Sequence, residues 1–429
     1  MKLHVSLNDF VVGYLSKDKH GGLYFEYTSE WLSTAGARPI SLSLPLTAQK
    51  YSGEIVYNFF DNLLPDNPAI RNKIQSRFQL STNHAFDLLA AIGHDCVGAI
   101  QLSQHAPVSV KTMQYESLTE TDIEQLLAGY REAPLGMLAE DTDFRISIAG
   151  AQEKTALLKI GDTWNKPIGS TPTSHILKLP MGELPHVNID LSESCENEFV
   201  CLELARALGF EAARSEVVQF GSQRVLSVER FDRKYARDGS WLMRLPQEDF
   251  CQAMGMSSAL KYQADGGPDI QACMKLLSAS SCKEDRDTFF SSQILFWLLA
   301  GIDGHAKNFS VYLMPDNRYR MTPLYDILSA HPLMQKPGGL AKQKIKMAMS
   351  LKGKNTQWKW DKILPRHFLS TARQVGYSEL AAKQTLERIA DELETAIELV
   401  ESKIPTQFPE HIAAAIFAGV RGRAKRIAI

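Results

Sequence analysis

The sequence predicts an α+β protein with a bilobal architecture, in which a small mixed α/β subdomain precedes a β-rich lobe and an all-helical C-terminal lobe. Three observations favour this fold class. The length of 429 residues suggests two or three packed units. Short strand-like segments dominate roughly the first 245 residues, and helical periodicity dominates the rest. The predicted divisions are 1–105 for the subdomain, 120–245 for the β-rich lobe and 246–429 for the helical lobe.

The N-terminal subdomain is expected to combine short strands with one or two helices. Residues 42–46 (LSLPL) alternate like a strand, and residues 60–68 (FDNLLPDNP) are expected to end a helix in a proline-rich turn. Residues 92–102 predict a glycine-framed turn that enters a strand. A polar connection at about 103–120 then leads to a helix at about 122–132.

The two lobes differ in their periodicity. Between about 143 and 245 the pattern is strand-like, apart from one helix at about 193–208. Beyond 245 it is helical, and a hairpin at 309–325 is the one expected exception. An apolar helix at about 286–299 precedes that hairpin, so the loop between them is framed by two regular elements.

Composition argues against several classes of protein. Hydrophobic residues make up 44% and charged residues 22% of the chain, which is the balance of a folded globular protein. No export signal is visible, and the most apolar segment, 294–300, is far shorter than the roughly 20 residues that span a bilayer. Six cysteines without a Cys-x-x-Cys pair argue against structural zinc and disulfides, so we expect a cytoplasmic protein.

The sharpest chemical signal is the loop at 301–310 (GIDGHAKNFS), where an aspartate and an asparagine stand five residues apart. Phosphoryl transfer needs a carboxylate that accepts the hydroxyl proton and oxygen ligands that hold Mg²⁺ on the phosphates. Asp303 suits the first task and Asn308 the second. His305 and Lys307 are expected to contact the cofactor, and His305, which lacks suitably spaced metal-binding partners, is given no catalytic role.

Hairpin geometry predicts a second acidic metal ligand. Residues 309–314 and 319–324 alternate like strands around a four-residue turn. Pairing across that turn sets position 308 opposite position 325, so Asp326 is expected beside Asn308. The alternative is that the three side chains are ordinary turn and capping residues, which is the commoner role of any one loop aspartate. Their convergence on one hairpin favours the metal site.

A phosphate-binding segment is predicted earlier in the chain. Residues 144–158 predict a strand, a turn of small residues and a second strand, and the small side chains would let backbone N–H groups approach phosphate oxygens. The segment is neither a Gly-x-Gly-x-x-Gly loop nor a Walker A motif, and such a turn alone is more often only a turn. The residues expected to bind the cofactor here are Ala149, Gly150, Ala151, Gln152 and Lys154.

A lysine and a glutamate are expected to support the phosphates. Lys178 lies in a predicted strand among apolar neighbours and suits the cation that a kinase places on the α- and β-phosphates. The alternative is an exposed edge lysine. The helix that follows offers Glu198, on its apolar face, as the partner of that lysine, whereas Glu203 is expected at the surface.

Residues 225–228 predict an apolar strand that enters the charged turn 229–233 (ERFDR). Backbone groups of Glu229 and Phe231 suit the edge of an adenine ring, and either Asp232 or Gln247 suits a ribose hydroxyl. A strand that simply ends in a salt-bridged turn is an equally open interpretation.

Together with residues 62–65 (NLLP) and 98–99 (GA), these motifs resemble the HipA family, the serine/threonine kinase toxins of bacterial toxin–antitoxin pairs. The resemblance spans nearly the whole chain. It implies a protein-kinase-like fold related to phosphatidylinositol kinases, with ATP and Mg²⁺ as cofactors. The implied roles are phosphate contact for Lys178, backbone contact with adenine for Glu229 and Phe231, catalytic base for Asp303, and Mg²⁺ ligands for Asn308 and Asp326.

The resemblance also implies regulation and partners. Ser147 matches the family's regulatory serine, whose autophosphorylation inactivates the enzyme and expels the phosphate loop. The implied partners are a helix-turn-helix antitoxin, operator DNA bound through the antitoxin complex, and glutamyl-tRNA synthetase as protein substrate. The expected outcome of activity is inhibited translation, growth arrest and persistence.

Lysine and arginine accumulate near the C-terminus, at 342–354 and 421–426. Such a run is usually a solvated face, but it would also suit DNA phosphates if the antitoxin sits on an operator. Two alternatives to a protein kinase stay open, namely a small-molecule or lipid kinase on the same fold and a catalytically weak co-repressor. The complete set of predicted metal ligands favours an active enzyme.

Overall fold

The structure is a computed structural model that describes residues 1–105, 109–129, 147–150, 152–184, 189–336 and 339–427. The chain forms two compact units, each discontinuous in sequence. None of the described helices is long and apolar enough to cross a membrane. The three domains predicted from the sequence are not tested by this division into two units and stay a prediction. Unit 1 comprises Met1–Leu179, Val218–Ser258 and Ser310–Tyr319, and unit 2 comprises Pro180–Val217, Ala259–Phe309 and Arg320–Ile429.

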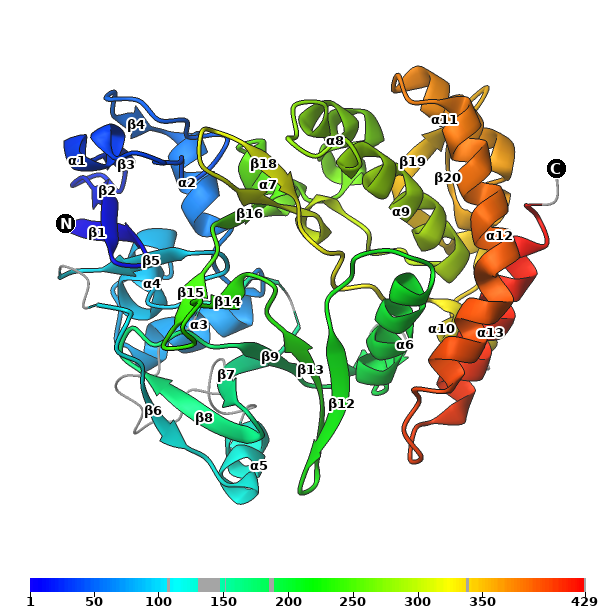
Figure 1. Cartoon of the computed structure of the whole chain (residues 1–429), viewed down its shortest axis with the longest axis horizontal. Coiled ribbons are helices and arrows are strands. Elements are labelled where there is room, and N and C mark those ends of the chain that lie inside the picture. The colour runs from blue at the N-terminus through cyan, green and yellow to red at the C-terminus, as the bar shows by residue number, and fades with distance from the viewer. Residues whose placement is uncertain (106–108, 130–146, 151, 185–188, 337–338, 428–429) are drawn as a thin grey trace. The chain divides into compact units, whose positions relative to one another are not determined.

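Unit 1 begins with a five-stranded antiparallel sheet in the order β4-β3-β2-β1-β5 (Figure 1). Alternate residues of its strands, such as Leu3, Val5 and Leu15, are buried, as expected for a sheet with one face on the core. The predicted helix before the proline-rich turn is confirmed as α2. The elements are β1 (Lys2–Leu7), β2 (Phe10–Lys17), β3 (Leu23–Tyr27), α1 (Ser29–Ser33), β4 (Tyr51–Ser52), α2 (Glu54–Asp61), α3 (Pro68–Arg77), α4 (Ala85–Ile92) and β5 (Ile100–Ser103).

The strand predicted at 42–46 is wrong, because this segment forms only an isolated bridge between Ser41 and Leu44. Its polar groups bind a distant glutamate instead: the Ser41 hydroxyl and the Leu42 N–H donate to Glu248 at 2.5 and 2.7 Å. Burial raises the pKa of Glu248 to about 8, although these two hydrogen bonds oppose the shift. The alternating apolar residues at 42–46 therefore belong to a turn with a buried Leu44 and not to a strand.

The second sheet has six strands in the order β12-β13-β9-β7-β8-β6, and all of it except the first three residues of β12 belongs to unit 1. Helix α5 begins at a capping box in which Thr119 and Asp122 exchange hydrogen bonds, and it matches the helix predicted near residue 122. The elements are β6 (Gln114–Ser117), α5 (Glu120–Ala128), β7 (Lys154–Ile160), β8 (Thr163–Ile168), β9 (His175–Lys178), β12 (Ser215–Phe220), β13 (Gln223–Glu229), β14 (Arg233–Tyr235), β15 (Leu242–Arg244), β16 (Gln247–Asp249), α7 (Phe250–Ala253) and β17 (Ser310–Leu313).

Unit 2 is built mainly from helices. Helix α9 is buried along nearly its whole length, and α12 buries Leu386, Ile389 and Leu393 at helical spacing while its opposite face is charged. The elements are β10 (Gly182–Leu184), β11 (Ile189–Leu191), α6 (Ser194–Ala207), η5 (Gln263–Asp265), α8 (Ile270–Leu277), α9 (Asp285–Leu299), η6 (Ala306–Asn308), β18 (Tyr319–Met321, which begins in unit 1), α10 (His331–Gln335), η7 (Lys342–Lys344), β19 (Lys346–Lys352), β20 (Thr356–Lys359), η8 (Trp360–Lys362), α11 (Pro365–Gln374), α12 (Glu379–Glu401) and α13 (Glu410–Ala424).

The expectation that a single hairpin interrupts the helices after residue 245 is wrong. Strands β19 and β20 form a second antiparallel hairpin, and β16 pairs with β17. The five residues from Met347 to Leu351 are all buried, so β19 shows none of the alternation that identifies a half-buried strand.

Candidate active site

The loop at 301–308 leaves helix α9 through a sharp turn. Ala300 adopts a left-handed conformation (φ 49°, ψ 41°) and ends the helix, and the N–H of Gly301 donates to Phe296 O at 2.7 Å. A Cβ atom at Gly301 would lie 2.6 Å from the Phe296 ring, so the turn requires glycine. A rigid buried helix therefore fixes the start of the loop.

Asp303 stands in this loop with its side chain 45% exposed. The hydroxyl of Tyr262 hydrogen-bonds to its Oδ1 atom, and Nε2 of His305 lies 3.9 Å from the same oxygen. The second carboxylate oxygen has no hydrogen-bond partner among the described residues. Asp303 thus has an oxygen available for a substrate hydroxyl, as the role of base requires.

Asn308 is buried and its amide is held in one orientation. Its Nδ2 donates to the backbone carbonyls of Asp303 at 2.7 Å and of Asp326 at 3.4 Å. This network assigns the amide nitrogen to the backbone and leaves Oδ1 as the atom that can bind a cation. The predicted proximity of Asp326 to Asn308 is confirmed.

Asp326 itself has a positive φ of 58°, a conformation that few residues other than glycine adopt. The neighbouring Tyr325 hydroxyl donates to Lys307 O at 2.7 Å, which ties the two segments together as the hairpin argument anticipated.

The side chains of Asn308 and Asp326 offer oxygen ligands, which suit Mg²⁺ better than a soft metal ion. Among the described residues, no group of three or more His, Cys, Asp or Glu side chains could hold a metal ion. Magnesium commonly takes only one or two protein oxygens and completes its shell with water and substrate phosphates. One carboxylate and one amide oxygen beside Asp303 fit that requirement.

His305 and Lys307 are both buried in the same loop. The His305 ring packs edge-to-face on Tyr262 at 4.8 Å, and burial lowers the pKa of His305, which favours the neutral imidazole. The cofactor contacts predicted for these two residues stay predictions.

In unit 1, the predicted phosphate segment lies partly within the described residues. Ala151 and residues 144–146 lie outside them, so the first of the two predicted strands is not tested there. Gly150 has a φ of 108°, and a Cβ atom at that position would lie 2.6 Å from Lys154 Nζ. Gln152 donates to Leu179 O at 2.8 Å and anchors the segment beyond the end of β9.

Lys154 and Lys178 lie directly opposite each other on β7 and β9. Both are buried, with 7% and 6% of their surface exposed. Two cations on paired strand positions supply positive charge that suits a phosphate. The sequence did not reveal that the two predicted residues are cross-strand partners.

The strand that leads to the predicted adenine contact is confirmed as β13, which ends at Glu229 opposite His175. The carbonyl of Phe231 accepts a hydrogen bond from the Tyr312 hydroxyl at 2.9 Å. A carbonyl oxygen has two lone pairs and can accept more than one hydrogen bond, as contact with an adenine edge would require. Tyr312 was not singled out from sequence.

The two ribose candidates have very different surroundings. Asp232 is buried, and its carboxylate binds Arg230 and the N–H of Gly98, with Arg233 3.0 Å away. Gln247 is also buried, but its Oε1 has no hydrogen-bond partner among the described residues. The geometry therefore argues against Asp232 as a ribose ligand and favours Gln247, because the Asp232 carboxylate is already committed.

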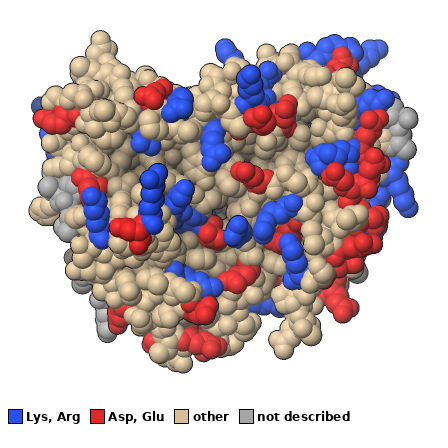
Figure 2. Space-filling view, in the orientation of Figure 1, with Lys and Arg blue, Asp and Glu red and all other residues tan. Residues whose placement is uncertain are grey.

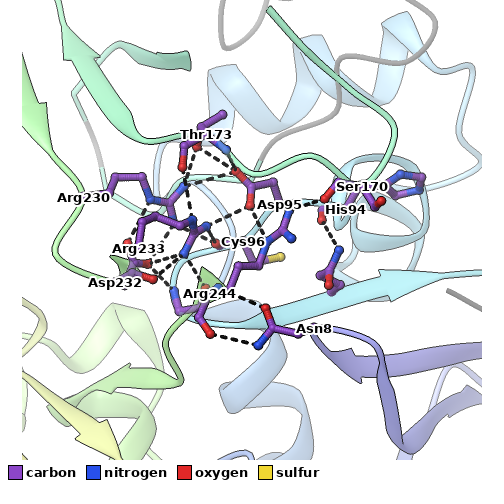
Figure 3. A network of polar contacts seen from close by, with 12 residues as sticks. Asn8, His94, Asp95, Cys96, Ser170, Thr173, Arg230, Asp232, Arg233 and Arg244 are labelled. Carbon is purple, nitrogen blue, oxygen red and sulfur yellow. Dashed lines mark hydrogen bonds and ion pairs between the residues drawn. The ribbon is translucent and has the colours of Figure 1, made fainter. Parts of the chain in front are cut away.

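Asp232 belongs to a buried network of three arginines and two aspartates in unit 1 (Figure 3). Asp95 binds Arg230, Arg233 and Arg244 at 3.3, 2.8 and 2.8 Å and also accepts from Thr173. Burial alone would raise the pKa of Asp95, but the three guanidinium groups outweigh it and hold that pKa well below its usual range. The network fixes the turn at 229–233 to the glycine-framed turn at 93–98.

Ser147 is attached to the same turn. Its N–H donates to Asp95 O at 3.0 Å, and its hydroxyl, completely buried, donates to Leu63 O at 2.8 Å. The segment is therefore docked inside unit 1, with the hydroxyl inaccessible.

The helix glutamates depart in part from expectation. Glu198 is buried in α6, in agreement with its predicted apolar face. The surface position predicted for Glu203 is wrong: it is 3% exposed and binds Arg206 and Lys403 at 2.6 and 2.7 Å. Helical periodicity could not reveal these two cationic partners.

Two family models match the chain, the HipA N-terminal domain over residues 3–103 and the HipA-like C-terminal domain over residues 146–397. The second model alone covers more than half of the sequence. The chain belongs to the HipA family. The resemblance inferred from the motifs is thereby confirmed.

Individual relatives agree with this family assignment. The candidate kinase Y4mE of Sinorhizobium fredii is 34% identical over 334 residues, which cover 76% of this chain and 77% of that protein. The serine/threonine-protein kinase toxin HipA of Shewanella oneidensis is 29% identical over 344 residues, covering 77% and 75%. The predicted enzyme class, a protein serine/threonine kinase, is confirmed: both relatives are named kinases, and HipA of Shewanella oneidensis is named a serine/threonine-protein kinase.

A solved structure supports the fold. HipA from the complex of the Shewanella oneidensis MR-1 toxin–antitoxin proteins HipA and HipB with operator DNA superimposes with a TM-score of 0.81 at 24% identity, covering 99% of this chain and 97% of that one. The predicted α+β fold class, with N-terminal sheets and a mainly helical C-terminal part, is confirmed.

The basic C-terminal stretch of this HipA family member is less uniform than its sequence indicates. Arg423 is buried and lies 3.5 Å over the Trp360 ring, while Arg421 binds Glu394 and Arg426 binds Asp361. Figure 2 shows acidic and basic side chains interspersed where Figure 1 draws α12 and α13. Several of these cations therefore stabilise unit 2, and the predicted DNA contact stays a prediction.

Proposed function

We propose that this chain is an ATP- and Mg²⁺-dependent protein serine/threonine kinase that acts in the cytoplasm as the toxin of a toxin–antitoxin pair. The observation that carries the proposal is the convergence of Asp303, Asn308 and Asp326, which supplies a base and two oxygen ligands on adjoining segments of unit 2. Membership of the HipA family and the names of its relatives support the same activity.

In the proposed reaction, one carboxylate oxygen of Asp303 accepts the proton of a substrate serine or threonine hydroxyl. The hydroxyl oxygen forms a bond to the γ-phosphorus as the bond from that phosphorus to the ADP oxygen breaks. Asn308 Oδ1 and the Asp326 carboxylate would hold Mg²⁺, which neutralises charge on the phosphates when bound. Oxygen ligands of this kind match the metal's preference.

Unit 1 would bind the nucleotide. Lys154 and Lys178 supply positive charge for its phosphates, and Gly150 lets the backbone come close to them. The carbonyl of Phe231 suits the adenine. The Oε1 atom of Gln247, which has no hydrogen-bond partner among the described residues, suits a ribose hydroxyl that donates to it. The adenine contact of Glu229 belongs to the same proposal.

We infer that Ser147 is the site of self-inactivation. A phosphoserine carries about −1.5 to −2 charges and can no longer donate its hydroxyl to Leu63 O. The modified residue does not fit its present buried position, so phosphorylation is expected to displace the segment and remove the phosphate-binding residues beside it.

The partners of the proposed toxin are a helix-turn-helix antitoxin, operator DNA bound through the antitoxin, and glutamyl-tRNA synthetase as substrate. The solved complex of a family member with HipB and operator DNA supports the first two. Phosphorylation of the synthetase would inhibit translation and cause growth arrest and persistence. The second candidate function, a catalytically weak co-repressor, predicts antitoxin binding without phosphate transfer.

The test is incubation of the purified chain with Mg²⁺ and ATP labelled on the γ-phosphate, with and without glutamyl-tRNA synthetase, followed by mapping of the labelled residue. Label on Ser147 or on the synthetase, absent in Asp303→Ala, is the expected result. Ser147→Ala is expected to keep labelling the synthetase without inactivating itself. Equal labelling by wild type and Asp303→Ala would reject the assignment of the base.

A further inference from the structure

Tyr262 is the one described side chain that hydrogen-bonds to the carboxylate of Asp303. No motif in the sequence drew attention to it. Its hydroxyl contacts Oδ1, and its ring packs edge-to-face on His305 with 4.8 Å between ring centres. Because Nε2 of His305 lies 3.9 Å from the same oxygen, the two rings hold one side of the carboxylate.

The backbone around Tyr262 is fixed at several points. The carbonyl of Lys261 accepts a hydrogen bond from the N–H of Ala306, which joins this segment to the catalytic loop at 3.2 Å. The carbonyl of Tyr262 accepts from the N–H groups of Asp265 and Gly267 at 3.0 and 2.9 Å. A Cβ atom at Gly267 would lie 2.0 Å from Leu260 O, so this tight turn requires glycine.

The next side chain along the segment is anchored as well. Gln263 and Ser350 of β19 form two hydrogen bonds: the Gln263 amide donates to the Ser350 hydroxyl at 3.0 Å, and the Ser350 N–H donates to Gln263 Oε1 at 2.8 Å. Tyr262 therefore sits between two anchored neighbours, and a residue held in this way can fix the orientation of another.

Asp303 needs such a restraint. Its side chain is 45% exposed, and a half-exposed aspartate in a loop has several rotamers available. A hydrogen bond to Oδ1 selects one of them and leaves the other oxygen for the substrate hydroxyl. Misplacing a reacting group by about 1 Å can cost roughly 100-fold in rate, so a fixed carboxylate is worth a large factor in turnover.

We propose that Tyr262 is a positioning residue of the kinase, which orients the Asp303 carboxylate toward the substrate hydroxyl through its own hydroxyl group. This inference rests on the proposed function. Tyr262 touches neither substrate nor cofactor in this scheme, and it acts only through Asp303.

The test compares Tyr262→Phe with Tyr377→Phe. Both variants lose only a hydroxyl and keep the ring. Tyr377 is the matched control, because an aspartate, Asp287, contributes to raising the pKa of its hydroxyl, and its ring stacks on Phe290 elsewhere in unit 2. The measurements are the rate of γ-phosphate transfer at saturating ATP, the KM for ATP and the temperature of unfolding.

Tyr262→Phe is expected to lower the transfer rate roughly 10- to 100-fold while the KM for ATP and the unfolding temperature stay at wild-type values. Tyr377→Phe is expected to keep the wild-type transfer rate. A purely structural role would lower the unfolding temperature or change both kinetic constants together, so the separation of rate from KM is the diagnostic result.

Four results would overturn the inference while leaving the proposed function intact. The rate in Tyr262→Phe could be unchanged, or it could be raised, which would make Tyr262 a residue that blocks the base. The rate could also fall together with the unfolding temperature or with a changed KM, or Tyr377→Phe could show an equal loss. Wild-type protein that transfers no phosphate would instead reject the proposed function and this inference with it.

Discussion

Two aspartates of this protein, each close to a glycine and a histidine in sequence, occupy opposite environments. Asp95 is 3% exposed, and its two oxygens accept from three arginines and from Thr173. Asp303 has a side chain that is 45% exposed, and Tyr262 is its single hydrogen-bonding side chain in the part of the chain that the structure describes. The two residues share a type and a similar local motif, so neither feature distinguishes them. The number of hydrogen-bond partners of the carboxylate separates the aspartate that stabilises the fold from the one that is available for chemistry.

The largest expected effect is on catalysis at the exposed aspartate. Asp303→Asn keeps the size of the side chain but removes the proton acceptor, so phosphate transfer is expected to fall roughly 10²- to 10⁴-fold. The unfolding temperature should match wild type, because few groups depend on this carboxylate. The measurement is transfer from γ-labelled ATP alongside thermal unfolding, and substantial residual transfer would remove Asp303 from the role of base.

The same substitution at the buried aspartate is expected to act on stability. Asp95→Asn leaves Arg230 and Arg233 with Asp232 and leaves Arg244 without a carboxylate in the network, and breaking a buried ion pair costs about 3–5 kcal/mol. Denaturant unfolding measures the loss, with Asp303→Asn as the matched control. If the two variants had equal free energies of unfolding, Asp95 would not stabilise the fold more than Asp303 does.

A smaller effect is expected on nucleotide binding. Asp326→Asn removes one charge from the proposed metal site but keeps a residue type that tolerates a positive φ. The affinity for ATP in the presence of Mg²⁺ should fall by about tenfold, or 1.4 kcal/mol. Titration calorimetry with and without Mg²⁺ measures it.

Asp316→Asn is the control for that variant, because Asp316 also has a positive φ (62°) but is exposed in the β17–β18 turn. It is expected to bind ATP like wild type. An Asp326→Asn protein whose Mg²⁺-dependent affinity equals that of this control would exclude Asp326 as a metal ligand.

The smallest expected effect separates the two ribose candidates. Gln247→Leu removes the unpartnered Oε1, so ATP affinity should fall by about 0.5–1.5 kcal/mol, the net value of one hydrogen bond. Stability should not fall, since an unsatisfied buried acceptor is lost. Gln219→Leu, at an exposed strand position, is the control. If both variants bound ATP with equal affinity, Gln247 would be excluded as the ribose ligand.

The sequence was most informative where chemistry depends on close spacing. Asp303 and Asn308 stand five residues apart, and the turn between β17 and β18 was enough to bring Asp326 beside them. The strands that hold Lys178 and Glu229 were also predictable, because their apolar patterns are local.

Partners from distant parts of the chain were not predictable. The Arg244–Asp95 ion pair joins residues 149 positions apart, and the Lys403–Glu203 pair spans 200. Periodicity says which face of an element is apolar, but it does not say which buried charge meets which. For the same reason, Asp232 looked as suitable for ribose as Gln247 until the arginines around it were known, and Tyr262 carried no signal at all.

The kinase activity is tested most directly by the time course of phosphate transfer from γ-labelled ATP by the wild-type chain, with Mg²⁺ and with EDTA. We expect transfer to protein that requires Mg²⁺ and stops as Ser147 becomes modified. Wild-type protein that binds its antitoxin yet transfers no phosphate, with or without Mg²⁺, would contradict it and favour a co-repressor.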